Sequence, residues 1–448
     1  ILEDQQGKGE LRPVRAKKTD MDTVRAITEK IRQSKRPVLN VGNGVRIAGA
    51  HEVLMKVIER LGIPVVTGWN SQDAIYDQHP LYTGRAGGMG DRAGNFAVQN
   101  SDLVFSVGSR LSIRQVGYNY QTWARAAYVM VNDVDAEELK KPSVHADMRI
   151  HADAKDLLET LEAYLEQEQE SGALPMPVFD GGKGLEGMDW RETCRMWKET
   201  YPVVLPKHMN HGDDEPANVY ALVKELSSRL KEGQITVVGN GSACVVGGHG
   251  YVIKKGQRFI SNSAIASMGY DLPAAIGACV ANKRYCRETG EKEQDIICVT
   301  GDGSIQMNLQ ELQTIIHHQY PIKIFLINNG GYHSIRQTQN NYFGKPLIGI
   351  GKDSGDLSFP DMAKLAPAYG FPFIRIDSND ALGEGIEKAL SVNGPVICEV
   401  MVDMDQKFEP KAASKPMPDG SMVSAPLEDL APFLPEEELK SIMRWSKE

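Results

Sequence analysis

The chain has 448 residues, of which 41% are hydrophobic and 24% are charged, and its formal net charge is −9. A chain of this length and ordinary composition has room for two or three domains and is not dominated by disorder. The acidic balance, without a basic cluster interleaved with aromatic residues, argues against nucleic acid as a partner, and no apolar run is long enough to cross a membrane.

Residues 21–165 alternate strand-like runs with helix-like stretches, which predicts a first domain with a doubly wound parallel sheet. The strand-like runs are 37–41, 63–67, 103–107 and 128–131, and a helix-like stretch covers 50–61. Glycine-rich turns follow these strands at 42–44, 84–90 and 108–114. Such turns could bind a dinucleotide, but ordinary strand exits fit them equally well, because none is the GxGxxG fingerprint.

The rest of the chain divides by composition. Residues 1–20 are polar and linker-like, and residues 166–189 are rich in Glu, Gln, Gly and Pro, which predicts a second linker. A second α/β domain is predicted over 190–410, with strands near 235–239, 258–261, 295–300, 322–327, 373–376 and 396–402. A Pro-rich tail follows over 411–448, in which residues 424–434 fit either a docking segment or a plain surface tail.

Two neighbouring strands of the second domain end on polar residues that suit a metal ion. The apolar run 295–300 leads into Gly301-Asp302-Gly303-Ser304, and the run 322–327 leads into Asn328-Asn329. Asn308 and Glu311 could form a capping box for the helix between them. Open α/β sheets bind ligands at the carboxyl ends of their strands, and Mg²⁺ prefers oxygen ligands shared between carboxylates and substrate phosphates. A lone GDGS turn is weak evidence, but the paired spacing predicts a magnesium diphosphate site.

These motifs resemble the diphosphate-binding domain of thiamin-diphosphate enzymes, with a likeness to the acetolactate synthase large subunit over residues from about 20 to 410. In that family the Asp of GDG, the second Asn and a backbone carbonyl two residues later bind the metal. The resemblance therefore implies Asp302, Asn329 and Gly331 as Mg²⁺ ligands. The fold it implies is a pair of doubly wound α/β domains, a central one and a diphosphate-binding one.

Further segments extend the implied thiamin diphosphate site. The turn after the first strand of the second domain resembles a diphosphate contact, and the block 263–277 resembles the segment beneath the cofactor rings. Met268 would be the apolar wedge that bends the cofactor, although a core methionine is an alternative, and the Ala266 carbonyl would accept a hydrogen bond from the pyrimidine. The complete implied set of cofactor-binding residues is Gly239, Asn240, Gly241, Ser242, Ala243, Ala266, Met268, Gly301, Asp302, Gly303, Ser304, Asn329, Gly331, Tyr332 and His333.

The first domain resembles the family's central domain, which holds FAD, usually in a structural role. The matching positions for flavin contacts are Gly42, Gly44, Gly88, Met89, Gly108, Arg110, Arg114 and Asp133. Two positions depart from the family pattern: Gly90 stands where a His follows the Met, and Ser112 stands where an Asp follows the Arg. FAD is therefore a candidate cofactor rather than a firm expectation.

The implied activity is decarboxylation of a 2-oxo acid with carboligation, as a transferase or lyase of the acetolactate synthase type. His333, Ser334, Arg336 and Gln337 could line the substrate pocket, with a satisfied loop histidine as the alternative for His333. Thr338 stands where acetolactate synthases have a Trp after Gln, which suggests an acceptor other than pyruvate. The alternatives are a simple 2-oxo acid decarboxylase and an inactive cofactor-binding fragment.

Family active sites also need a pyrimidine-binding domain with a glutamate, and none is recognised after the polar, linker-like opening at Ile1. We expect that domain to come from a preceding segment or a separate subunit, in a homo-oligomer. The six cysteines form no CxxC pair, and Cys298 and Cys398 lie in apolar strands, so reduced core thiols of a cytoplasmic protein are expected. No signal peptide is recognised.

Overall fold

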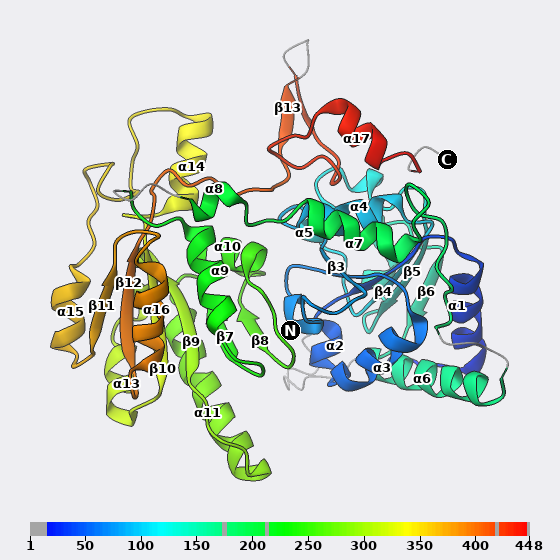
Figure 1. Cartoon of the computed structure of the whole chain (residues 1–448), viewed down its shortest axis with the longest axis horizontal. Coiled ribbons are helices and arrows are strands. Elements are labelled where there is room, and N and C mark those ends of the chain that lie inside the picture. Colours follow the sequence, from blue (N-terminus) through cyan, green and yellow to red (C-terminus); the bar gives the residue numbers. More distant parts are fainter. Residues whose placement is uncertain (1–15, 173–176, 211–214, 417–420, 446–448) are drawn as a thin grey trace, which may run out of the picture. The chain divides into compact units, whose positions relative to one another are not determined.

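The computed structural model describes residues 16–172, 177–210, 215–416 and 421–445 (Figure 1). It divides into two compact units. Among the described residues, unit 1 contains 16–74, 80–172, 177–201, 411–416 and 421–445, and unit 2 contains 75–79, 202–210 and 215–410. The predicted linker over 1–20 lies mostly outside the described residues.

Unit 1 is built on a six-stranded, wholly parallel sheet with the order β3-β2-β1-β4-β5-β6. The chain moves outward in one direction from β1 to β3 and in the other from β4 to β6, which is the doubly wound arrangement. The strands are β1 (Pro37–Val41), β2 (Val65–Thr67), β3 (Tyr82–Arg85), β4 (Leu103–Val107), β5 (Tyr128–Asp133) and β6 (Met148–His151). Its helices are α1 (Met21–Gln33), α2 (Gly44–Ile47), α3 (His51–Leu61), α4 (Arg92–Asn100), α5 (Ile113–Val116), α6 (Ala154–Glu170), α7 (Trp190–Thr200) and α17 (Glu436–Ile442), with short 3-10 turns at Gln72–Ala74, Tyr120–Thr122 and Glu138–Lys140.

Unit 2 repeats this architecture with the strand order β11-β12-β10-β9-β7-β8, again all parallel. Its strands are β7 (Ile235–Val238), β8 (Arg258–Ser261), β9 (Ile296–Gly301), β10 (Ile322–Asn328), β11 (Phe373–Ile376) and β12 (Val396–Met401). Its helices are α8 (Pro206–Met209), α9 (Val219–Arg229), α10 (Ser242–Gly250), α11 (Asp271–Thr289), α12 (Asp302–Ile305), α13 (Glu311–His318), α14 (His333–Tyr342), α15 (Met362–Ala368) and α16 (Leu382–Ser391), with a 3-10 turn at Gln306–Asn308. The predicted fold class, two doubly wound parallel-sheet domains, is confirmed.

The core of unit 2 explains why its strands read as unbroken apolar runs. The central strands β9 and β10 are covered on both faces, and Ile296, Cys298, Ile324 and Leu326 are fully buried. Helix α11 packs against them through Leu272 and its neighbours. All six cysteines are buried and free. Among the described residues, we find no helix with both the length and the apolar character needed to cross a membrane.

The predicted linker over 166–189 is wrong in its described part. Helix α6 continues to Glu170, and Phe179 and Leu185 are buried. Helix α7 after them also belongs to unit 1, because Trp190 is fully buried and donates from its ring nitrogen to the carbonyl of Pro37 at 3.0 Å. Residues 173–176 lie outside the described part. The change of units thus comes near Tyr201 rather than at residue 190.

The tail over 411–448 packs on unit 1 in its described parts, where it forms a hairpin of β13 (Ser414–Pro416) and β14 (Met422–Ser424) before α17. Glu428 is buried and accepts hydrogen bonds from Gln99 and Arg125, both at 2.7 Å. The tail also reaches a predicted flavin contact, because the backbone of Ala412 donates to the carbonyl of Gly88 at 2.7 Å. The segment therefore has fixed anchors on the central domain.

Replacing Glu428 by alanine should release this segment, because Arg125 and Gln99 would lose their buried acceptor. We expect the free energy of unfolding to fall by about 2 kcal/mol. Limited proteolysis should cut the segment faster than in the parent chain. Glu436→Ala is the matched control, since that side chain is 80% exposed and should change neither measurement. Equal protection of both variants would contradict the anchoring role.

Candidate functional site

Three strands bring their carboxyl ends to one edge of the unit 2 sheet. In the register, Val238 of β7 lies opposite Val299 of β9, and Ile327 of β10 lies opposite Gly301 of β9. The turns that follow these three strands therefore begin side by side. They carry three of the sequence motifs, which are the 239–243 turn, the GDGS turn and the Asn-Asn turn.

Asp302 and Asn329 meet at this edge. Asp302 is buried, and its two carboxylate oxygens accept hydrogen bonds from the backbone of Gly303 at 2.8 Å and of Gly331 at 2.9 Å. Asn329 is also buried and donates from Nδ2 to Oγ of Ser242 at 3.1 Å. Its Oδ1 has no hydrogen-bond partner. A buried oxygen without a donor is costly unless a bound group supplies one or a cation binds it.

The electrostatics of Asp302 agree with a cation at this place. Burial raises the pKa of its carboxyl to about 6, although the N–H groups of Gly303 and Gly331 and the charge of Arg336 act in the opposite direction. The carboxylate is thus poorly stabilised by its own surroundings, and a divalent cation would supply the missing positive charge. The donor set, a carboxylate and an amide oxygen, has the hard oxygen character that Mg²⁺ prefers.

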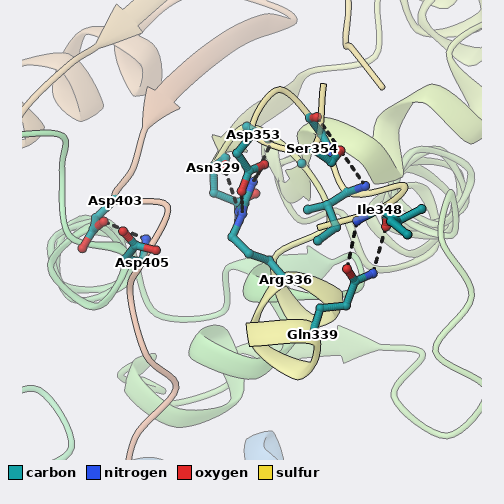
Figure 2. Close-up of polar contacts among 12 residues, drawn as sticks. Asn329, Arg336, Gln339, Ile348, Asp353, Ser354, Asp403 and Asp405 are labelled. Carbon is teal, nitrogen blue, oxygen red and sulfur yellow. Dashed lines mark hydrogen bonds and ion pairs between the residues drawn. The ribbon is translucent and has the colours of Figure 1, made fainter. Parts of the chain in front are cut away.

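The segment after Asn329 is held by a fully buried arginine. Arg336, on α14, donates to the carbonyl oxygens of Asn329 and Gly330, both at 3.1 Å, and makes a bidentate pair with Asp353 at 2.8 and 3.0 Å. Figure 2 shows this fan of contacts, together with Gln339, which bonds both backbone groups of Ile348. The pair with Arg336 holds the pKa of Asp353 below its usual range. Helix α14 therefore fastens the loop 348–354 against the Asn-Asn turn.

The turn after β7 and the block around Ala266 are joined directly. Gly241 has a φ of 62°, which turns the chain into α10, and Asn240 donates from Nδ2 to the carbonyl of Ala266 at 2.7 Å. Ala266 itself has a φ of 56°, a left-handed conformation that costs a non-glycine residue about 1 kcal/mol or more. The carbonyl predicted to face the pyrimidine thus has a protein donor already and is held by a strained backbone.

A cavity of about 520 Å³ lies between these segments. Its size is that of a small-molecule site. It collects most of the predicted thiamin diphosphate residues, including Met268, which is half-buried. The predicted residues on its wall are Asn240, Gly241, Ser242, Met268, Gly301, Asp302, Gly303, Ser304, Asn329, Gly331, Tyr332 and His333, and Ser334, Ile335, Ile327 and Gly349 complete it. Gly239, Ala243 and Ala266 belong to the same segments but do not line the cavity.

The four residues predicted to line a substrate pocket separate into two groups. His333 and Ser334 line the cavity, whereas Arg336 and Gln337 do not. Burial lowers the pKa of His333, and its Nε2 lies 2.6 Å from the carbonyl of Gln406, so a neutral ring that donates there is favoured. Thr338 is exposed and its hydroxyl donates back to the carbonyl of Ser334 at 3.0 Å. On α14, Ile335 lines the cavity and Thr338 does not.

The capping-box prediction at Asn308 and Glu311 is wrong. The chain is already helical at Gln310, which precedes α13 without a side-chain cap. Asn308 instead donates from Nδ2 to the carbonyl of Gly269 at 2.7 Å. This contact joins the 3-10 turn after α12 to the segment that carries Met268. The two segments are far apart in the chain, so no local sequence pattern could reveal the contact.

The predicted flavin residues of unit 1 lie at the carboxyl edge of its sheet but in separate contacts. Gly42 and Gly44 pack on the backbone of Gly108, where a side chain at either position would overlap the Gly108 carbonyl. Gly88 accepts from Ala412 and donates to the carbonyl of Arg114 at 2.9 Å. Arg110 pairs with Glu138 at 3.2 Å, and beside it Asp133 lines a cavity of only about 10 Å³. That volume holds about one water molecule, so FAD at these residues, with Met89 among them, stays a prediction.

Three structural residues around the cavity, Asp353, Gln406 and Asp271, were not predicted from the sequence. Asp353 and Gln406 act through contacts with α14 that lie 17 and 73 residues away in the chain. Asp271 was visible only as one letter of a longer block. A buried acidic residue within an otherwise small and apolar segment is the one signal that could have pointed to it.

Comparison with known proteins agrees with this geometry. The model of the thiamine pyrophosphate enzyme central domain matches residues 24–161, and the model of the C-terminal TPP binding domain matches residues 239–400. The first match falls almost wholly in unit 1 and the second in unit 2. The first model covers all six strands of the unit 1 sheet, and the second covers the unit 2 sheet except β7 and the last residue of β12.

Curated relatives carry acetolactate synthase names. The chain is 32% identical over 383 residues to a probable acetolactate synthase large subunit of Methanocaldococcus jannaschii, covering 83% of this chain and 58% of that protein. It is 30% identical over 381 residues to the isozyme 3 large subunit of Escherichia coli K12, covering 84% of this chain and 61% of that protein. The chain thus spans about three fifths of the length of the curated relatives it matches. It belongs to the thiamine pyrophosphate enzyme family and carries that family's central domain and C-terminal TPP binding domain.

Proposed function

We propose that unit 2 holds thiamin diphosphate and Mg²⁺ in the 520 Å³ cavity, for an enzyme that decarboxylates a 2-oxo acid and joins the remainder to a second carbonyl compound. The observation that carries the proposal is the pairing of two buried oxygen ligands on one cavity wall. One is the Asp302 carboxylate with its raised pKa, and the other is the unpaired Oδ1 of Asn329.

Each segment of the cavity has a distinct part in this proposal. Asp302, Asn329 and the carbonyl of Gly331 would hold the metal, and that carbonyl also accepts from the backbone of His333 at 3.0 Å. A carbonyl oxygen has two lone pairs and can serve both. The N-terminal turn of α10, from Ser242 onward, would present backbone N–H groups to the diphosphate. Met268 and Ala266 would support the rings.

Thiamin diphosphate, when bound, supplies a nucleophilic carbon and an electron sink for loss of carbon dioxide. The protein residues contribute orientation and exclusion of water. Half-buried Met268 and the exposed apolar side chain of Ile335 give the cavity part of its apolar lining. Neutral His333 would add a polar group to the cavity wall without adding a positive charge to that of the metal.

The acceptor and the assembly are further parts of the proposal. The relatives are named acetolactate synthases. Thr338 is exposed and does not line the cavity, so the acceptor, pyruvate or another carbonyl compound, is decided by product analysis. Because the chain spans about three fifths of those relatives, the pyrimidine-binding domain and its glutamate would come from elsewhere, in a homo-oligomer. A flavin in unit 1 would be structural.

Calorimetric titration with thiamin diphosphate, with and without Mg²⁺, tests the cofactor site. We expect binding that requires Mg²⁺ and that tightens when a pyrimidine-binding domain is added. Product analysis of the completed enzyme with pyruvate, alone and with a second carbonyl compound, then separates the reactions, since acetaldehyde alone in both cases would indicate a simple decarboxylase and a ketol in either would indicate carboligation. Absence of Mg²⁺-dependent binding in both titrations would refute the proposed site.

A further inference from the structure

The carboxylate of Asp271 bonds segments that form the cofactor cavity, but Asp271 does not line the cavity itself. Asp271 is the first residue of α11 and is 0% exposed. Its Oδ2 accepts hydrogen bonds from Thr300 at 2.6 Å and from Ser304 at 2.8 Å, and its Oδ1 accepts from the backbone of Leu272 at 3.0 Å. A carboxylate is rarely buried so completely without such partners, and the helix N-terminus favours its charge.

The two hydroxyl donors flank the proposed metal ligand. Thr300 stands two residues before Asp302 at the end of β9, and Ser304 stands two residues after it. Oδ2 of Asp271 therefore accepts hydrogen bonds from residues on both sides of Asp302 in the GDGS turn. Both hydroxyls donate to Oδ2, so the directions of both hydrogen bonds are fixed.

The same carboxylate also reaches the segment that carries Met268. The backbone of Gly269 donates to Oγ of Ser304 at 3.0 Å, while Ser304 in turn donates to Asp271. The hydrogen bonds thus run in one direction from Gly269 through Ser304 to Asp271, and such chains strengthen each other in a buried setting. Asn308 adds a second tie, to the carbonyl of Gly269 at 2.7 Å.

A third segment packs on this carboxylate. A side chain at Gly239, the first residue after β7, would overlap Oδ2 of Asp271 and come within 3.1 Å of its Cγ. The backbone of Gly239 donates to the carbonyl of Val299 at 2.8 Å, which sets the turn directly beside β9. The 239–243 turn, the GDGS turn and the Met268 segment therefore all meet at Asp271.

We propose that Asp271 is a positioning residue of the cofactor site. It fixes the distance between the metal and diphosphate anchor at Asp302 and the apolar wedge at Met268, so that both ends of one bent cofactor are met at once. This inference rests on the proposed function. A site held rigid before binding loses less conformational entropy when the ligand arrives, so Asp271 should contribute to affinity for a ligand that spans both ends.

The test compares a ligand that spans both ends with one that reaches only the anchor. In Asp271→Asn, an NH₂ donor faces two hydroxyl donors, and the fixed hydrogen-bond directions are lost. With Mg²⁺ saturating, we expect the dissociation constant of thiamin diphosphate to rise about tenfold, and that of inorganic pyrophosphate to rise less than about threefold. Calorimetry on the whole chain measures both.

Two further variants keep the test decisive. Ser304→Ala removes one link of the chain and should show the same preference for loss of thiamin diphosphate over pyrophosphate, which decides the matter if Asp271→Asn does not fold. Thr236→Val, on strand β7, is the matched control, because it loses a buried hydroxyl contact of 2.7 Å to Tyr251 at the end of α10. It should leave both affinities unchanged even if the melting temperature falls.

The outcomes separate this inference from the proposed function. Equal weakening of both ligands in the folded variants, or no weakening of either, would show that Asp271 serves only stability and would overturn the inference. If the parent chain itself binds no thiamin diphosphate with Mg²⁺, the proposed function fails and the inference falls with it. A selective loss in both Asp271→Asn and Ser304→Ala supports the positioning role.

Discussion

Replacing Asp302 by alanine should weaken Mg²⁺-dependent binding of thiamin diphosphate by more than about a hundredfold. Asp302 is the one carboxylate on the wall of the described cavity, and loss of even an indirect partner of a metal ligand costs 10- to 100-fold in many sites. Titration of the variant with thiamin diphosphate at increasing Mg²⁺ measures the effect. Asp377→Ala is the control, since that side chain is exposed and pairs with Arg375 on the surface.

The direction of the pH dependence gives this prediction a second readout. Burial raises the pKa of Asp302 from 3.8 to about 6 in the chain without metal. The unfolded chain therefore releases this proton more readily, and the charge destabilises the folded chain as pH rises from 3.8 to 6. Asp302→Asn should consequently melt no lower than the parent at pH 7. Below pH 6, protons compete with the metal, and the parent's apparent Mg²⁺ affinity should fall by about tenfold per pH unit.

A folded Asp302→Ala variant with unchanged Mg²⁺ dependence would exclude Asp302 as a ligand. A variant that loses binding only because it unfolds would instead melt well below the parent. The two cases are distinguished by a melting curve recorded without cofactor. The raised pKa predicts that this curve is unaffected or improved for Asp302→Asn, which removes the charge and keeps an acceptor oxygen for Gly303 or Gly331.

The strands of unit 2 could be predicted because burial on both faces leaves a simple signature. The runs at β8 and β11 were placed with their exact bounds, and those at β7, β9, β10 and β12 within one residue at each end. In unit 1, the strands β3 and β6 were not predicted. β3 contains the buried polar residues Thr83 and Arg85, which do not read as an apolar run. Their burial depends on tertiary contacts, such as the hydrogen bond of 2.8 Å from the backbone N–H of Arg85 to the carboxylate of Asp91.

The part of the site that lies at the ends of neighbouring strands could be predicted from the sequence. Asp302 and Asn329 follow adjacent parallel strands, so their meeting follows from topology alone. The roles of Arg336 and Asp271 do not follow in this way, because each acts through partners that the chain brings together only in three dimensions. The same limit applies to residues 177–189, whose mixed composition concealed buried Phe179.

Replacing Gly331 by alanine is the second change for which we expect a large effect. Gly331 has a φ of 144°, a region that side chains rarely adopt, and an added Cβ would overlap the carbonyl oxygen of Ile350 and lie 3.0 Å from Cα of Gly351. The strain alone costs about 1–3 kcal/mol. The overlap cannot be relieved by a side-chain rotation, because both neighbouring atoms belong to the backbone.

The Gly331→Ala substitution should also disturb the proposed metal site directly. The backbone N–H of Gly331 donates to Asp302 at 2.9 Å, and the bridge between Gly331 and Gly351 joins the Asn-Asn turn to the loop that Arg336 holds. Displacement of Gly331 therefore moves both a proposed ligand and the donor that orients Asp302. We expect a loss of about 3 kcal/mol or more in the free energy of unfolding, and Mg²⁺-dependent binding of thiamin diphosphate too weak to titrate.

Gly355→Ala is a control for a positive φ without overlap. Gly355 has a φ of 75°, which an alanine tolerates better than the φ of 144° at Gly331, and an added Cβ would meet nothing within 4 Å. It should cost only about 1 kcal/mol in denaturant unfolding and leave cofactor affinity unchanged. If Gly331→Ala behaved like Gly355→Ala in both measurements, the loop could yield without disturbing Asp302, and the close approach of Gly331 to Ile350 would have no part in binding. A large difference between the two glycines would instead place the cost in the overlap with Ile350 and the more strained φ of Gly331 together.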